Sequence, residues 1–116
     1  LTAKQDRFCM KDTMEPAHLG SHVGQTASGI YTCACCNSTL FHSSKKIDTG
    51  SGYATFISPI EHGSVGYKHH EGSWLHHPLD TGIHCEYCGS HLGNVREDGP
   101  PPHGRRYMVN SACLKF

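Results

Sequence analysis

Two pairs of cysteines in this chain have the spacing of a metal site. They are Cys33 with Cys36 and Cys85 with Cys88. Two intervening residues let both thiolates of a turn point at one ion, and two such turns complete the four-sulfur shell that zinc prefers. A disulfide framework is the other interpretation, but the cysteine count of seven is odd and the paired spacing fits a metal better. The sequence therefore predicts one zinc ion, with iron as the alternative.

The residues around these pairs refine the prediction. Asn37 and Gly89 directly follow the two pairs and suit the left-handed turns that such sites need. Cys35 lies inside the first pair and is expected to face away from the ion, with replacement of a neighbouring ligand as the alternative. Cys9 and Cys113 lack a CxxC partner, and we interpret them as small buried hydrophobic residues.

A turn-rich β domain has to position these cysteines. The chain of 116 residues is long enough for one domain with one core, and its 13 Gly and 6 Pro favour strands over a helical bundle. Runs of β-forming residues alternate with turn residues at 29–32, 39–41, 64–69, 83–85, 91–95, 106–110 and 112–116. We therefore expect a mainly β fold of two antiparallel sheets packed together, with the cysteine turns joining two loops.

The beginning of the chain differs from the rest. Residues 1–28 are expected to wrap the domain, with one short helical segment before Glu15 and Pro16, and residues 29–116 to form the zinc-binding β domain. A second candidate region is the loop from residue 70 to 81, which contains Trp74 as a possible interface anchor. Its histidines are interpreted as a solvated surface, with a second metal site as the alternative; they are His69, His70, His76 and His77.

Charge and hydropathy exclude two classes of partner. Ten Lys plus Arg balance ten Asp plus Glu, so no global field attracts nucleic acid. No run approaches the roughly 20 apolar residues that a membrane span requires, and no secretory signal is visible at the start. We expect a soluble intracellular protein, with cytoplasm and mitochondrion not distinguished.

Four segments occur together in one order along the chain. They are GIYTC (residues 29–33) with Cys36, GYATF (52–56), CEYCGSHLG (85–93) and RYMVNSACLKF (106–116). With these motifs the chain resembles the methionine-R-sulfoxide reductase family (MsrB, or SelR domain) over its whole length. The resemblance implies two antiparallel sheets with a structural zinc away from the substrate groove. It also implies that a cysteine thiolate attacks the sulfoxide, becomes a sulfenic acid, and is resolved by a second cysteine and recycled by thioredoxin.

The catalytic position of the family is changed in this chain. The residue two places after Arg106, where the family has its nucleophilic cysteine, is Met108. A thioether cannot become a thiolate or a sulfenic acid. The resolving cysteine that some members carry before Gly-Trp is matched by Ser51. The family's usual first step therefore fails at Met108.

Other groove positions are kept in part. Tyr53 stands where the family has a tryptophan, and Asn94 stands where it has a second histidine that exchanges protons. The Phe expected near Asn94 is Arg96. The resemblance assigns the groove to Tyr53, Phe56, His91, Asn94, Arg106 and Asn110.

Two hypotheses follow for the function, with a third for the groove alone. The first is a catalytically inactive, zinc-stabilised domain that acts as a structural or interaction subunit with a protein partner or larger assembly. The alternative is an active peptide-methionine (R)-S-oxide reductase that uses Cys113, Cys9 or Cys35, with thioredoxin or a small thiol as reductant. Cys113 follows Met108 at an odd separation, which in a regular strand places it on the opposite face. The third is a groove that binds methionine side chains without turnover.

Overall fold

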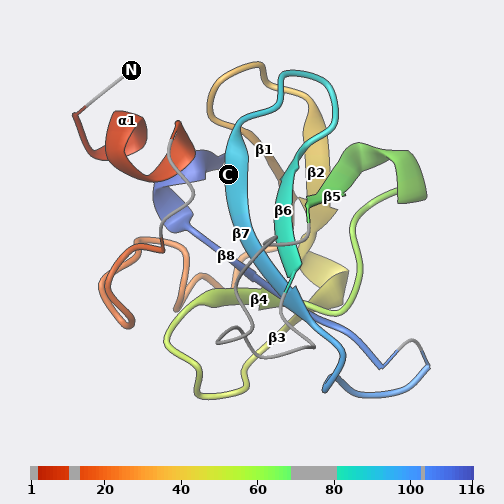
Figure 1. Cartoon of the computed structure of the whole chain (residues 1–116). Helices are drawn as coiled ribbons and strands as arrows, with labels where there is room; N and C mark the ends of the chain where they lie inside the picture. Colours follow the sequence, from red (N-terminus) through yellow and green to blue (C-terminus); the bar gives the residue numbers. More distant parts are fainter. Residues whose placement is uncertain (1–2, 11–13, 69–80, 103) are drawn as a thin grey trace, which may run out of the picture.

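Two antiparallel sheets form the body of the protein (Figure 1). The computed structural model describes residues 3–10, 14–68, 81–102 and 104–116. In this part, one sheet has the order β2-β1-β9, with β1 at Ile30–Cys33, β2 at Thr39–His42 and β9 at Leu114–Lys115. The other has the order β3-β4-β8-β7-β6-β5. Its strands are β3 (Lys46–Ile47), β4 (Ala54–Phe56), β5 (Val65–Lys68), β6 (Thr81–Cys85), β7 (His91–Arg96) and β8 (Arg106–Val109). The predicted fold class is confirmed.

Short helices close the corners of the sheets. They are α1 (Ala3–Cys9), η1 (Ser43–Lys45), η2 (His62–Ser64) and η3 (Ser111–Cys113). A helix as short as α1 is unstable alone, so packing must hold it. Phe8 and Cys9 are buried at its end, and α1 contacts η3 and β7. The N-terminal helix α1 and the C-terminal helix η3 therefore lie side by side at one side of the molecule (Figure 1).

Aromatic side chains from both sheets form the centre of the core. Phe41 of β2 stacks on Phe56 of β4, with ring centroids 4.4 Å apart. Tyr31 of β1 meets the same Phe56 edge-on at 5.2 Å, and Tyr107 of β8 lies next to Phe41. Burying a large aromatic side chain contributes roughly 2–3 kcal/mol, and aromatic pairs add to this. Phe56 therefore links the two sheets.

The structure differs from the sequence prediction at short elements. Neither β3 nor β4 was expected, because two or three residues are too few to show an alternating pattern, and all of β4 is buried. The strand expected at 112–116 is shorter, because η3 precedes Leu114. The other expected strands are present with small shifts at their ends.

The histidine-rich loop, with His69 and Trp74, lies outside the described residues. Only Thr81, the last residue of the predicted loop, is described, and it begins β6. Among the described residues, no helix is long and apolar enough to cross a membrane.

Candidate metal centre and groove

The four predicted zinc ligands come from two turns of the same form. Cys33 ends β1 and Cys85 ends β6. In each turn the carbonyl of the first cysteine accepts a hydrogen bond from the backbone N–H of the residue after the second cysteine. Asn37 donates to Cys33 at 2.9 Å, and Gly89 donates to Cys85 at 2.8 Å. Both donors have left-handed backbone, with φ of 64° and 80°. The predicted turn conformations are confirmed.

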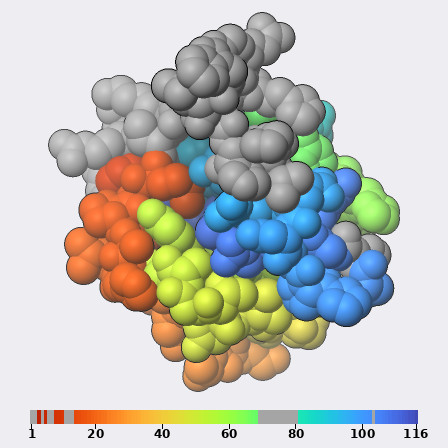
Figure 2. Space-filling model, turned by 60° about the horizontal axis from the view of Figure 1, so that its bottom comes forward, coloured from red at the N-terminus to blue at the C-terminus, as the bar shows by residue number. Residues whose placement is uncertain are grey.

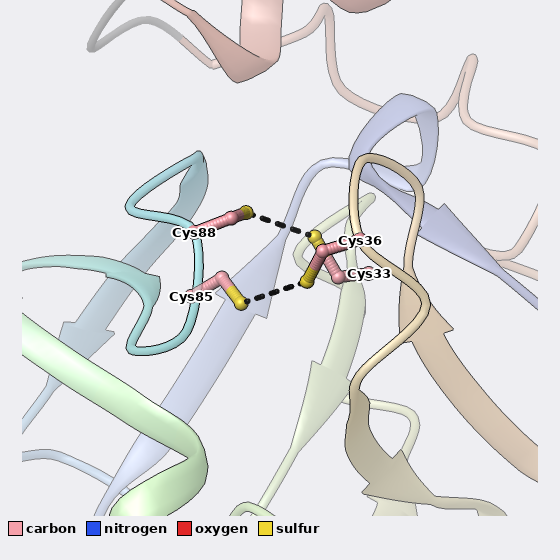
Figure 3. A group of neighbouring side chains, drawn as sticks. All are labelled: Cys33, Cys36, Cys85 and Cys88. Atoms are coloured by element: carbon pink, nitrogen blue, oxygen red, sulfur yellow. Dashed lines mark hydrogen bonds between the residues drawn. The ribbon is translucent and has the colours of Figure 1, made fainter.

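The four sulfurs converge on one point (Figure 3). The Sγ atoms of the four cysteines all lie within 4.8 Å of one another. Across the two turns, Cys33 and Cys88 are 3.6 Å apart, and so are Cys36 and Cys85. Zinc–sulfur bonds of about 2.3 Å in a tetrahedron place the sulfurs about 3.8 Å apart. The cluster can therefore bind one metal ion, as predicted.

Serine hydroxyls and burial set the acidity of these thiols. Burial raises the pKa of Cys33 to about 12, although a hydrogen bond with Ser90 opposes the change. For Cys36 the raising effect of burial is outweighed by hydrogen bonds with Ser38, whose hydroxyl lies 3.2 Å from its sulfur, and the pKa falls to about 7. Burial also raises the pKa of Cys85. Metal binding must therefore displace protons from this site.

Cys35 is separate from the converging sulfurs. Among the described residues, the cluster contains the four predicted cysteines and not Cys35. Its side chain is half-buried and packs against the hydrophobic core. Cys35 is therefore a free thiol next to the metal site.

Cys9 and Cys113 form a disulfide, which corrects their interpretation as simple buried hydrophobic residues. Each is only 1% exposed, so their burial was expected, but their bond was not. The disulfide joins α1 to η3, with Cα atoms 5.5 Å apart. No short-range spacing predicts this pairing, because only the fold brings the two chain ends together. The argument that Cys113 continues the alternation of the strand also fails, since β8 ends at Val109.

Met108 lies on the face of the six-stranded sheet that points away from the core. It pairs with Thr55 on β4 and with Asn94 on β7, so these three side chains share a face. Its neighbours Tyr107 and Val109 are buried on the opposite, core face. In Figure 2 the darkest blue part of the chain is recessed between lighter blue and yellow-green segments, as expected for β8 between β7 and β4.

Two further predicted groove residues are Arg106 on β8 and Tyr53 directly before β4. Arg106 is on the same face of β8 as Met108 and forms a two-point ion pair with Asp98, at 3.2 and 3.0 Å. Tyr53 is placed by the turn before β4, where its carbonyl accepts a hydrogen bond from the Thr55 hydroxyl at 2.8 Å. The Thr55 hydroxyl also lies 3.1 Å from Ser51, the position of a resolving cysteine in some family members.

The other predicted groove residues are buried. Phe56 is in the aromatic core, on the face of β4 opposite to Met108. His91 and Asn110 both bind the carbonyl oxygen of Phe8, at 3.0 Å from Nδ1 and 3.5 Å from Nδ2. These two hydrogen bonds therefore hold the end of α1 in place, next to Cys9 of the disulfide.

Comparison with known proteins agrees on one family. The SelR domain family matches residues 1–116. A protein of Teredinibacter turnerae named peptide methionine sulfoxide reductase MsrB is 40% identical over all of this chain and 84% of its own length. Proteins with the same name from Acinetobacter baylyi and Leptospira interrogans are 39% and 41% identical over all of this chain, covering 81% and 86% of their lengths.

These relatives contradict the hypothesis of a catalytically inactive structural or interaction subunit. They match the whole chain at about 40% identity and carry the name of an enzyme. Methionine at position 108 accounts for the loss of one thiol only. The chain has 7 cysteines, and four of them form the metal cluster. Because thiols remain outside the metal cluster, the loss at Met108 does not by itself exclude thiol chemistry.

Proposed function

The chain belongs to the SelR domain family, and on this premise we propose that it is a peptide-methionine (R)-S-oxide reductase with a displaced thiol. The observation that carries the proposal is the Cys9–Cys113 disulfide. A disulfide is the oxidised product of a two-cysteine reductase cycle. The other candidate, Cys35, is half-buried and is described as a free thiol. We therefore assign the redox couple to Cys9 and Cys113.

The cycle balances with these two residues. One thiol attacks the sulfoxide, the substrate sulfur–oxygen bond breaks, and oxygen is transferred to the cysteine as a sulfenic acid, leaving the thioether product. The second thiol then displaces the sulfenic oxygen as water and forms the disulfide. Two thiol groups of thioredoxin, or of a small dithiol, reduce that disulfide and are themselves oxidised. Such intracellular reductants agree with the expected intracellular location.

The surroundings of the couple support this assignment. Phe8 precedes Cys9, and its carbonyl is bound by His91 and Asn110, two residues that the resemblance assigns to the groove. The disulfide is therefore adjacent to residues of the expected substrate site. An imidazole at this place can also exchange protons during sulfoxide reduction.

Access to the couple requires α1 to move. Both cysteines are nearly inaccessible in the oxidised protein. Because α1 has only 7 residues, its position depends on the disulfide and on packing. Reduction removes the covalent tie, and opening of α1 then lets a sulfoxide side chain reach the thiols.

The metal cluster has a supporting part in this proposal. We propose that Cys33, Cys36, Cys85 and Cys88 hold a structural zinc ion, which stabilises the fold when it is bound. The backbone N–H of Ala34, inside the first cysteine turn, donates to the carbonyl of Cys113 at 2.9 Å. The cysteine turn therefore positions one member of the redox couple.

The test is reduction of a peptide containing the R epimer of methionine sulfoxide, with the S epimer as control. The pre-reduced wild type is expected to produce about one equivalent of methionine peptide without added reductant, and to turn over with dithiothreitol. Serine substitution of the attacking cysteine abolishes both. Serine substitution of the resolving cysteine keeps the single turnover but prevents recycling by thioredoxin.

A Cys35→Ser variant separates the two parts of the proposal. Full activity in this variant supports the Cys9–Cys113 couple. Loss of activity only in Cys35→Ser leaves the reductase function standing and moves the nucleophile to Cys35. Absence of product from the reduced, zinc-loaded wild type with either epimer rejects the reductase function itself.

A further inference from the structure

A pocket opens between the N-terminal segment and the corner formed by η3 and β9. Its volume is about 220 Å³. The described residues that line it are Gln5, Glu15, Gly20, Ser21, Ser111, Ala112 and Leu114. None of the residues assigned above to the metal, the redox couple or the groove lines it. The pocket is therefore a separate feature of the molecule.

The carboxyl group of Glu15 is the distinctive element of this pocket. Glu15 is 2% exposed, and its backbone N–H donates to the Asn110 side-chain oxygen at 2.8 Å. Its Oε1 accepts a hydrogen bond from the backbone N–H of Ala112 at 3.1 Å. Its Oε2 is buried and has no hydrogen-bond partner among the described residues. A buried carboxylate oxygen without a hydrogen bond costs free energy. A ligand that donates a hydrogen bond to Oε2 in the pocket would remove this cost.

The other lining residues indicate which chemical class of ligand carries this donor. Gln5 contributes an amide group, Ser21 and Ser111 contribute hydroxyl oxygens, and Ala112 and Leu114 contribute an apolar wall. The Ser111 hydroxyl also accepts a hydrogen bond from the backbone N–H of His22 at 3.0 Å, which leaves its second lone pair for a ligand. No basic side chain is among the described lining residues. A Cβ at position 20 would collide with Glu15 Oε2 and the Ser111 hydroxyl. Because Gly20 has no Cβ, both acceptors can lie close to the backbone of Gly20. The lining therefore suits a cationic donor group on an apolar stem.

We propose that this pocket binds a primary alkylammonium group, as found at the end of a lysine side chain or in a free aliphatic amine. An ammonium has three donors, which match Glu15 Oε2 and the two serine hydroxyls. A guanidinium pairs best with both oxygens of a carboxylate, but Oε1 is already bound to Ala112. A calcium ion requires six or more oxygen ligands, and Glu15 is the single carboxylate among the described lining residues. The site does not depend on the proposed reductase function.

The experiment titrates the oxidised, zinc-loaded protein with n-butylammonium and, as a matched neutral ligand, with n-butanol. Binding is followed by calorimetry and by the backbone amide signals of Ala112 and Leu114. We expect saturable n-butylammonium binding, at least about tenfold tighter than n-butanol. Equal binding of the two ligands, or no saturation up to about 100 mM n-butylammonium, overturns the proposal. This comparison requires no variant.

Variants locate the site. Glu15→Gln keeps the size of the side chain and an oxygen for Ala112, and is expected to weaken n-butylammonium binding about tenfold or more. Glu61→Gln, at an exposed acidic residue, is expected to bind like wild type. Unchanged binding in a folded Glu15→Gln variant contradicts the assignment. If that variant does not fold, Gly20→Ala tests the same site by crowding Oε2.

The source of the ammonium group is tested with peptides. A peptide containing lysine is compared with the same peptide containing norleucine. Selective binding of the lysine peptide at the same amide signals identifies a protein side chain as the ligand. Binding of n-butylammonium without binding of the lysine peptide identifies a small amine. Either result supports recognition of a primary ammonium group.

Discussion

Cys9 and Cys113 are joined by a disulfide although they are separated by 104 positions in the sequence. The bond ties α1 to η3, and the carbonyl of Cys113 also accepts a hydrogen bond from Ala34 in the first cysteine turn. The disulfide therefore connects the N-terminal helix to the C-terminal segment, and the hydrogen bond connects the C-terminal segment to the metal cluster.

Removal of the disulfide is expected to destabilise the protein. Cross-linking residues this far apart restricts the unfolded chain, and we expect Cys9→Ser or Cys113→Ser to lower the free energy of unfolding by about 2–4 kcal/mol. Urea unfolding of the oxidised proteins measures the change. Cys35→Ser is the control, with an expected loss below about 1 kcal/mol. Equal stability of Cys9→Ser and wild type would show that the disulfide does not hold the native state.

Removal of zinc is expected to unfold or strongly destabilise the domain. The four-cysteine cluster joins the ends of β1 and β6, so binding free energy of the metal contributes to folding. Elemental analysis should find one zinc per chain, and a strong chelator should lower the melting temperature by more than about 10 °C. A Cys35→Ser variant should keep the metal, whereas Cys85→Ser should lose it. Retention of zinc by Cys85→Ser would contradict the ligand assignment.

Zinc affinity is expected to fall as the pH is lowered. The bound form has thiolates, whereas burial raises the pKa of the metal-free Cys33, to about 12, and that of Cys85. Both thiols are therefore protonated at neutral pH, and each releases a proton on binding. Cys36, with a pKa of about 7, adds a further proton below pH 7 and little above it. Competition with a chromophoric chelator at pH 6, 7 and 8 should show that zinc affinity falls by at least about a hundredfold per pH unit as the pH is lowered, and more steeply at the acidic end. An affinity independent of pH would contradict this linkage.

Restoring a thiol in the groove is expected to increase reductase activity. Met108 faces the same side of the sheet as Asn94 and Thr55, where the family resemblance places the nucleophile. We expect Met108→Cys to raise the rate of R-sulfoxide reduction at least about tenfold, equivalent to about 1.4 kcal/mol in the barrier. Leu19→Cys, which adds a thiol at an exposed position, is the control. A Met108→Cys rate no higher than that of wild type would show that this face is not a working groove.

The aromatic link between the sheets is expected to dominate the core. Phe56 stacks on Phe41 and meets Tyr31 edge-on, so Phe56→Ala should cost about 3–5 kcal/mol in unfolding free energy. Tyr87→Ala, at a residue that is 82% exposed, should cost less than about 0.5 kcal/mol. Chemical denaturation of both variants gives the comparison. Similar stabilities of the two variants would be incompatible with the inter-sheet role of Phe56.

The cysteine turns and most of the strands could be predicted from local sequence. The positions of Cys33 and Cys36, like those of Cys85 and Cys88, follow from the geometry of a turn of a few residues, and Asn37 and Gly89 report its left-handed backbone. Strands long enough to show a regular pattern were predicted for the same reason. These are short-range properties, which local residue types control.

Features that depend on contacts between distant segments could not be predicted from local sequence. The chain ends meet only because α1 packs on η3, so the Cys9–Cys113 bond was not visible in the spacing of the cysteines. Phe56 was assigned to the groove by its motif, yet its place on a three-residue strand turns it into the core. Glu15 Oε2 likewise has no hydrogen-bond partner among the described residues only because folding removes that carboxyl group from water and places it against Ala112. Such pairings depend on the direction and packing of whole strands, which local sequence does not encode.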